Sequence, residues 1–180
     1  MNTNELRQIQ TPLKALYTES PAEALAEMRA FGVVDLSRLS CRVKTPFADS
    51  GITESGLHPK AGGDGRTACS GDMLLQSLVA CSGVTFAAVA TAMELEISAA
   101  SIEARGTMDF RGTLGVDRNT AVGLTSVELI FDVVSSEADD RIDKLIQLTE
   151  RYCVVLQTLR HGATCSARRG SVTDASSSPQ

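Results

Sequence analysis

The chain has 180 residues, of which 43% are hydrophobic and 4% aromatic, and its formal net charge at pH 7 is −5. This length suits one domain with a mainly aliphatic core. The net negative charge disfavours nucleic-acid binding, which depends on neutralising phosphates. The first ten residues are polar and lack the pattern of a signal segment. We therefore expect a cytoplasmic protein that binds no nucleic acid.

Residues 1–36 are predicted to form an N-terminal helical arm. Ser20, Pro21 and Glu23 make a helix start, because Ser caps, Pro fits the first turn, and Glu follows three residues after Ser, as in a capping box. This helix is expected to run to about Ala30. Such an arm would cover the core or cross to a partner chain.

Residues 37–47 alternate between apolar and polar side chains and are predicted to form a strand. The segment 49–67 is rich in glycine and polar residues and is expected to be a loop. It lacks the Gly-Lys-Ser/Thr ending of a phosphate-binding loop. We interpret it as a flexible connector rather than a functional loop.

The stretch from Ser70 to Met93 is predicted to be a long helix with Ser70 as its N-cap. It has no charged side chain between Asp72 and Glu94, and apolar residues lie on every face, so it must be buried in a core or in a membrane. Its length would just span a bilayer. However, polar residues interrupt it, and no Lys or Arg flanks it closely. We expect a helix of a soluble protein with no membrane partner.

Residues 102–110 and 127–133 show the alternation of two antiparallel strands, each with one buried face. Acidic residues after Ser136 predict a helix capped there, since a helix N-terminus favours negative charge. That helix should end near Cys153. The order of elements predicts a single α+β domain.

The C-terminal part is predicted to contain a short helical piece and then a last strand over residues 163–168. Residues 171–180 are too polar to bury and are expected to be a disordered tail. The folded domain should therefore cover residues 37–170.

Five cysteines, at positions 41, 69, 81, 153 and 165, are an odd number and argue against a disulfide framework. His161 and Cys165 are too few for a zinc site, which needs about four ligands, so we expect no metal and no cofactor. A thiol on a buried helix, such as Cys81, is usually a small hydrophobe but can be a nucleophile. Cys69 would lie roughly 18 Å away along the same helix, too far for a disulfide. The partner of Cys81 stays open at this point.

Two segments, CSGDMLLQSLVACSG at 69–83 and ERYCVVLQTL at 150–159, resemble the two cysteine segments of the OsmC/Ohr family of thiol-dependent peroxidases. The order of elements over about residues 39–168 also fits. The resemblance implies an OsmC/Ohr-like fold, in which antiparallel sheets wrap around a long buried central helix. It also implies that organic hydroperoxides are the substrates and that an external dithiol is the reductant.

By the same resemblance, Cys81 is the peroxidatic thiol, Cys153 is the resolving thiol, and Arg42 is the candidate cation that activates Cys81. The family holds its Arg with a Glu ten residues before the nucleophile. Here Gly71 occupies that position, and Asp72, one residue later, carries the carboxylate and is the corresponding candidate catalytic residue. This departure favours an alternative, a non-catalytic small-molecule binding or scaffold protein with the same fold and inert buried thiols.

The central helix also predicts an intertwined homodimer. One chain offers too few strands and helices to cover a helix that is apolar on all faces. We expect two copies of the helix to pack together with a sheet outside each, which gives two equivalent sites. Such an interface should bury more than roughly 2,000 Å².

Overall fold

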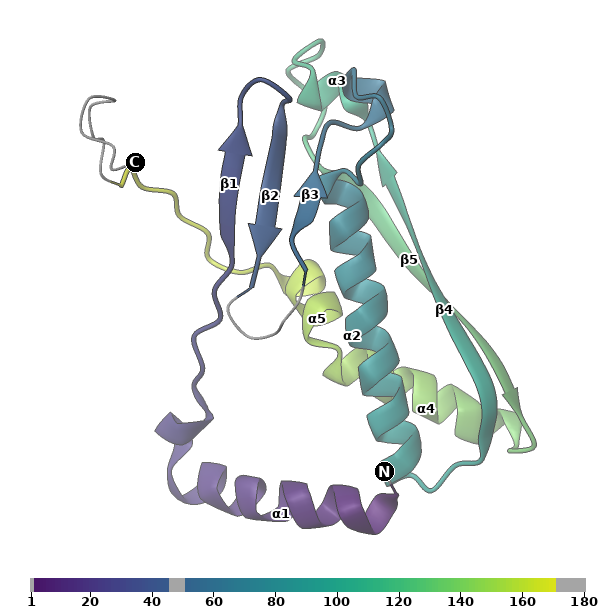
Figure 1. Ribbon diagram of the computed structural model, residues 1–180. Helices are drawn as coiled ribbons and strands as arrows, with labels where there is room; N and C mark the ends of the chain where they lie inside the picture. Colours follow the sequence, from purple (N-terminus) through teal and green to yellow (C-terminus); the bar gives the residue numbers. More distant parts are fainter. Residues whose placement is uncertain (1, 46–50, 171–180) are drawn as a thin grey trace.

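The computed structural model describes residues 2–45 and 51–170. The predicted disordered tail and the end of the first predicted strand therefore lie outside the described residues. A long helix, α2 (Ser70–Ala92), stands in the middle of the chain. In Figure 1 a long two-stranded ribbon lies on one side of α2 and a small three-stranded sheet on the other. This is the α+β arrangement expected from the sequence.

Helix α2 confirms the prediction of a long helix, but its cap differs. Cys69, not Ser70, is the N-cap, with an extended backbone (φ −79°, ψ 163°). The Cys69 N–H donates a hydrogen bond of 3.1 Å to the carboxylate of Asp72, because the third residue of a helix can reach back to its cap. At the other end, Glu94 adopts a left-handed conformation (φ 57°), and the helix ends just before it.

Two antiparallel strands form the ribbon that packs against α2. They are β4 (Ile97–Met108) and β5 (Leu124–Ser135). Both predicted strands, 102–110 and 127–133, are confirmed, although each starts earlier than expected and the first ends at Met108 rather than at Phe110. Gly106 lets α2 come close to the ribbon, since a Cβ at this position would lie 3.3 Å from Cδ1 of Leu75. A short helix, α3 (Phe110–Thr113), follows β4.

The second sheet has three short strands in the order β1-β2-β3, with both pairings antiparallel. The strands are β1 (Phe31–Asp35), β2 (Ser40–Lys44) and β3 (Thr53–Ser55). Strand β2 lies within the predicted strand 37–47. Strand β1 falls inside the predicted helical arm, and β3 falls inside the predicted loop 49–67. Three to five residues give too few positions for an alternating pattern to stand out.

The N-terminal helix differs most from the prediction. Helix α1 spans Thr3–Glu19, and the helix predicted over 20–30 is wrong, because just a 3₁₀ turn forms there, at Pro21–Ala24. The side chain of Asn2 accepts a hydrogen bond from the Glu5 N–H, and the Glu5 carboxylate accepts one from the Asn2 N–H. This capping box starts the helix earlier than predicted.

Two helices near the C-terminus confirm the expected helical segments. They are α4 (Asp139–Tyr152), whose N-cap is Ala138 rather than the predicted Ser136, and α5 (Val154–His161). The strand predicted over 163–168 is wrong, since these residues belong to neither helix nor strand. Every residue from 161 to 170 is exposed, so no burial compensates for the entropy of ordering a strand.

The core forms where α2, the ribbon and the C-terminal helices meet. One cluster of buried side chains consists of Leu78, Cys153 and Leu156. A second cluster consists of Phe86, Ala90 and Leu145. Helix α2 contributes to both clusters, so it is the central element of the fold, as predicted.

One chain covers only one side of α2. The buried positions are Leu78, Ser82, Phe86 and Ala90. They recur every four residues and so form one stripe. The residues Ala80, Val84 and Ala87 are exposed, and at about 100° of rotation per residue they lie on the far side of the helix. The prediction of burial all round is therefore not met within a single chain.

Candidate functional site

The structure brings Cys81 and Cys153 together from elements that are far apart in sequence. Cys81 lies in the middle of α2 and is partly exposed, whereas Cys153 is fully buried (0% exposed). Both thiols pack in the cluster around Leu78 and Leu156. The two residues named by the family resemblance thus share one site.

Cys153 lies at the break between α4 and α5. Its N–H donates to the Thr149 carbonyl at 2.9 Å and closes α4, while its own carbonyl accepts from the Gln157 N–H at 2.9 Å and opens α5. Cys153 is thus the N-cap of α5, with a non-helical backbone (φ −70°, ψ 107°). The first N–H groups of a helix have no partner within the helix. Because α5 begins here, the N–H groups of Val154 and Val155 are available to the Cys81 thiol.

The surroundings of Cys81 favour its thiolate form. Partial burial raises the pKa of the Cys81 thiol, but hydrogen bonds from the Val155 N–H, the Cys153 thiol and the Val154 N–H outweigh this effect. The Thr85 hydroxyl adds a smaller contribution, and the net result is a pKa below the ordinary value. Because the thiolate is the nucleophilic form of cysteine, these contacts favour Cys81 as a nucleophile.

Ser82 is the next residue along α2 and contacts the other thiol. Its Oγ lies 3.4 Å from Sγ of Cys153, and both residues are 0% exposed. Either atom can be the donor in this hydrogen bond. The two thiols therefore have different environments, since backbone donors surround Cys81 and a buried hydroxyl contacts Cys153.

The predicted activating groups lie elsewhere in this chain. Arg42 is exposed on β2, opposite Glu54 of β3 in the strand register, and the contacts that shift the pKa of Cys81 include no cation. Asp72 binds the Cys69 N–H at the start of α2. Gly71 lies beside it and has no side chain to hold an arginine. Within one chain, neither Arg42 nor Asp72 is brought to the thiols by a contact of the described residues.

The sequence analysis missed Ser82, Thr85 and the start of α5. Thr85 lies four residues after Cys81, so helical spacing could have indicated it. Ser82 carries no comparable signal, because its role depends on a contact with a residue 71 positions later. The N–H groups of α5 could be found only once the break at Cys153 was known.

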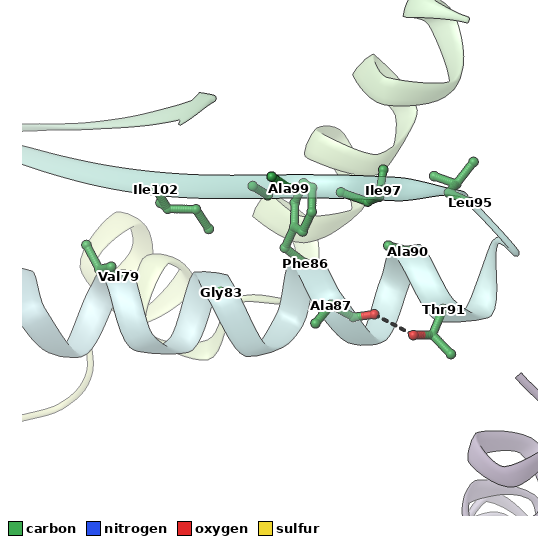
Figure 2. Close-up of a pocket in the computed structure, with 11 residues that line it drawn as sticks. Val79, Gly83, Phe86, Ala87, Ala90, Thr91, Leu95, Ile97, Ala99 and Ile102 are labelled. Carbon is green, nitrogen blue, oxygen red and sulfur yellow. Dashed lines mark hydrogen bonds between the residues drawn. The ribbon is translucent and has the colours of Figure 1, made fainter. Parts of the chain in front are cut away.

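A groove of about 500 Å³ runs between α2 and β4. Figure 2 shows Val79, Gly83 and Ala87 on the helix side of this groove, with Ile97 and Ile102 on the strand side. Its lining is mainly apolar. The groove lies next to the exposed stripe of α2, so both features leave apolar surface open in a single chain.

Within residues 2–45 and 51–170, no group of three or more His, Cys, Asp or Glu side chains could hold a metal ion. His161 and Cys165 are both exposed. Among the described helices, α2 is long and apolar enough to cross a membrane. Core helices of soluble proteins have the same length and hydropathy, so this is weak evidence.

Comparison with known proteins gives one family. The family model described as OsmC-like protein matches residues 63–168, which include both cysteine segments. No curated protein matches the chain.

Solved structures share the fold at low sequence identity. An OsmC-like protein from Mycoplasma pneumoniae is 19% identical, with a TM-score of 0.62 over 76% of this chain and 89% of that one. An organic hydroperoxide resistance protein from Elizabethkingia anophelis is 16% identical, with a TM-score of 0.61 over 77% and 91%. An OsmC-like protein of unknown function from Vibrio cholerae is 12% identical, with a TM-score of 0.60 over 74% and 94%.

Proposed function

This chain belongs to the OsmC-like protein family, and on that premise we propose that it is a thiol-dependent peroxidase that reduces organic hydroperoxides. The observation that carries the proposal is the pair of adjacent thiols, one partly exposed with a lowered pKa and one buried beside it. One structural neighbour is named an organic hydroperoxide resistance protein, which supports the choice of substrate class.

In the proposed reaction, the Cys81 thiolate attacks the distal oxygen of a hydroperoxide. The O–O bond breaks, the alcohol leaves after taking up a proton, and Cys81 becomes a sulfenic acid. The Cys153 thiol then attacks the Cys81 sulfur, and the hydroxyl leaves as water with the proton of Cys153. This yields a Cys81–Cys153 disulfide, which an external dithiol reduces by thiol–disulfide exchange.

The activation of Cys81 is proposed to combine two sources. The N–H groups at the start of α5 act within the chain. Arg42 remains our candidate for the cation, and we propose that it approaches Cys81 of a second copy, since in its own chain it is exposed on β2. Asp72 would contribute indirectly, by holding the start of the helix that carries the nucleophile.

The proposal includes a homodimer, supported by the uncovered side of α2 and the groove beside it. Val84 is 73% exposed, although it lies in the middle of the most apolar helix of the chain. Apolar surface of this extent on a core helix normally marks an interface. A second copy of α2 packed here would supply the cover that one chain lacks.

Steady-state reduction of cumene hydroperoxide with dithiothreitol as electron donor tests the peroxidase. Wild-type protein should turn over, and Cys81→Ser should abolish turnover because no other described thiol has the same contacts. Cys165→Ser is the matched control, since Cys165 is an exposed cysteine outside the cluster that contains Cys81 and Cys153. Unchanged turnover in Cys81→Ser would refute the assignment.

The alternative, a small-molecule binding or scaffold protein, is favoured by the absence of the family's Glu at Gly71. A sulfenic-acid probe separates the two functions. In Cys153→Ser, treated with one equivalent of hydroperoxide, the peroxidase predicts labelling of Cys81. If the chain is a binding or scaffold protein with inert thiols, Cys81 should stay unlabelled.

A further inference from the structure

The buried hydroxyl of Ser82 contacts Cys153, the thiol that acts in the second step of the proposed reaction. A serine inside a helix can donate to a backbone carbonyl about one turn earlier, as Ser77 does to Leu74 at 2.8 Å. Ser82 instead contacts Sγ of Cys153 at 3.4 Å, across the contact between α2 and α5. It is one of the few buried polar residues of the described chain.

Resting on the proposed function, we propose that Ser82 is a positioning residue for the resolving step, because its hydroxyl holds Sγ of Cys153 beside Cys81 and donates to it as it becomes the attacking thiolate. Cys153 must lose its proton before it can attack. At 0% exposure, water does not reach the sulfur to stabilise the negative charge. Among the described side chains, the Ser82 hydroxyl is the hydrogen-bond donor placed to do so.

The role of Ser82 falls mainly in the second step of the reaction. Attack on the hydroperoxide uses Cys81, whose contacts are the start of α5, Cys153 and Thr85. Ser82 is absent from that set and acts on Cys81 through Cys153. Removal of the Ser82 hydroxyl should therefore slow disulfide formation much more than sulfenic-acid formation.

The resolving step can be measured without any hydroperoxide. In a variant with serine at positions 41, 69 and 165, Ellman's reagent forms a mixed disulfide on Cys81, the more exposed of the remaining thiols. Attack by Cys153 on the Cys81 sulfur then forms the internal disulfide and expels thionitrobenzoate, whose absorbance gives the rate. The same variant, with serine at positions 41, 69 and 165, is used to measure the consumption of cumene hydroperoxide in a single turnover.

Ser82→Ala should slow thionitrobenzoate release about tenfold, which corresponds to about 1.4 kcal/mol of barrier, while single-turnover peroxide consumption stays within about twofold. Thr149→Val is the matched control, since Thr149 is also 0% exposed and its hydroxyl bonds to the Leu145 carbonyl rather than to a thiol. It should leave both rates unchanged, as should Ser77→Ala.

Release at the wild-type rate, or faster, in Ser82→Ala would overturn the role of Ser82. An equal slowing in Thr149→Val would also overturn it, because the effect would then come from losing any buried hydroxyl. Failure of the wild-type protein to consume hydroperoxide would contradict the proposed function instead. The thionitrobenzoate measurement would still decide whether Ser82 assists Cys153.

Discussion

At the scale of single residues, the main feature is that two neighbouring thiols have different surroundings. Cys81 faces backbone N–H donors at the start of α5 and is partly exposed. Cys153 is enclosed and contacts Ser82. A nucleophile that meets the substrate needs access and a stabilised thiolate, while a resolving thiol needs no access to solvent but must lie within reach of the first sulfur and lose its proton. The difference in environment therefore matches the difference in proposed role.

The lowered pKa of Cys81 predicts a pH dependence that does not require turnover. Alkylation by iodoacetamide follows the thiolate, so the rate at Cys81 should rise with pH to a half-maximum below the ordinary pKa of a cysteine, because the pKa of Cys81 is lowered. Because the folded pKa is depressed, the thiolate persists as the pH falls below that ordinary value. Mass spectrometry of the Cys81 peptide measures the rate.

The same peptide in urea-unfolded protein is the control, and its half-maximum should return to the ordinary value. A folded half-maximum at or above that of the unfolded chain would contradict the role of the α5 N–H groups.

The sequence led to both cysteines but not to their contacts. The pairing of Cys81 with Cys153 came from the family resemblance, since spacing excluded Cys69 and left the partner open. Ser82 lies in a run of small residues on α2, where nothing in the local pattern distinguishes it from Ser77. Its contact depends on how α5 crosses α2, which is a property of the tertiary structure.

At the scale of elements, long periodic segments were predictable and short ones were not. Helices α2 and α4 and strands β4 and β5 each show several repeats of their hydrophobic pattern. Helix α1 was missed because residues 1–19 show no clean apolar period. None of its residues is buried, so no apolar face is needed for packing. Strands β1 and β3 are stabilised by pairing with β2 rather than by burial, and pairing leaves little trace in composition.

Asp72 gives a prediction at the start of α2. Its carboxylate accepts from the Cys69 N–H and lies at the positive end of the helix dipole. Asp72→Ala should lower the free energy of unfolding by about 0.5–1 kcal/mol, and peroxide consumption should change little. Urea unfolding followed by circular dichroism measures the first quantity.

Asp143→Ala serves as the control, because it removes an exposed negative charge from α4 outside the first turn. Unchanged stability combined with a large loss of turnover in Asp72→Ala would return Asp72 to the catalytic role that the sequence suggested.

At the scale of the whole molecule, the central helix α2 is covered on one side and exposed on the other. Strands β1 and β2 stand away from α2 in Figure 1, and Val33 and Val34 of β1 are 62% and 65% exposed. Helix α1 contacts the end of α2, where the Thr3 hydroxyl donates to the Thr91 carbonyl at 2.8 Å. The sequence predicted that α2 needs cover on all sides but could not say which side its own chain would leave bare. The structure identifies that side as the stripe through Ala80, Val84 and Ala87.

This exposed stripe predicts a dimer and a variant that weakens it. Sedimentation equilibrium at low micromolar concentration should give twice the chain mass of 19.0 kDa for wild type. Val84→Arg would bury a charge in the interface and should weaken association about a hundredfold. Val122→Arg is a closely matched control, since Val122 is also a valine that is 73% exposed, but it lies in the loop before β5.

A wild-type monomer, or equal weakening by both arginine variants, would contradict the packing of two α2 helices. A dimer that dissociates only in Val84→Arg would support it.

In the proposed reaction, the enclosure of Cys153 also determines which sulfur an external reductant can reach. Once the internal disulfide has formed, an incoming thiol must approach one of its two sulfurs in line with the S–S bond. The side chain of Cys153 is buried among residues of α2, α5, β4 and β5, while Cys81 is partly exposed. The reductant should therefore bond to Cys81 and expel Cys153 as the leaving group. The hydroperoxide and the reductant would then both approach the Cys81 sulfur from the same exposed side. A bulky hydroperoxide bound there would delay reduction of the disulfide.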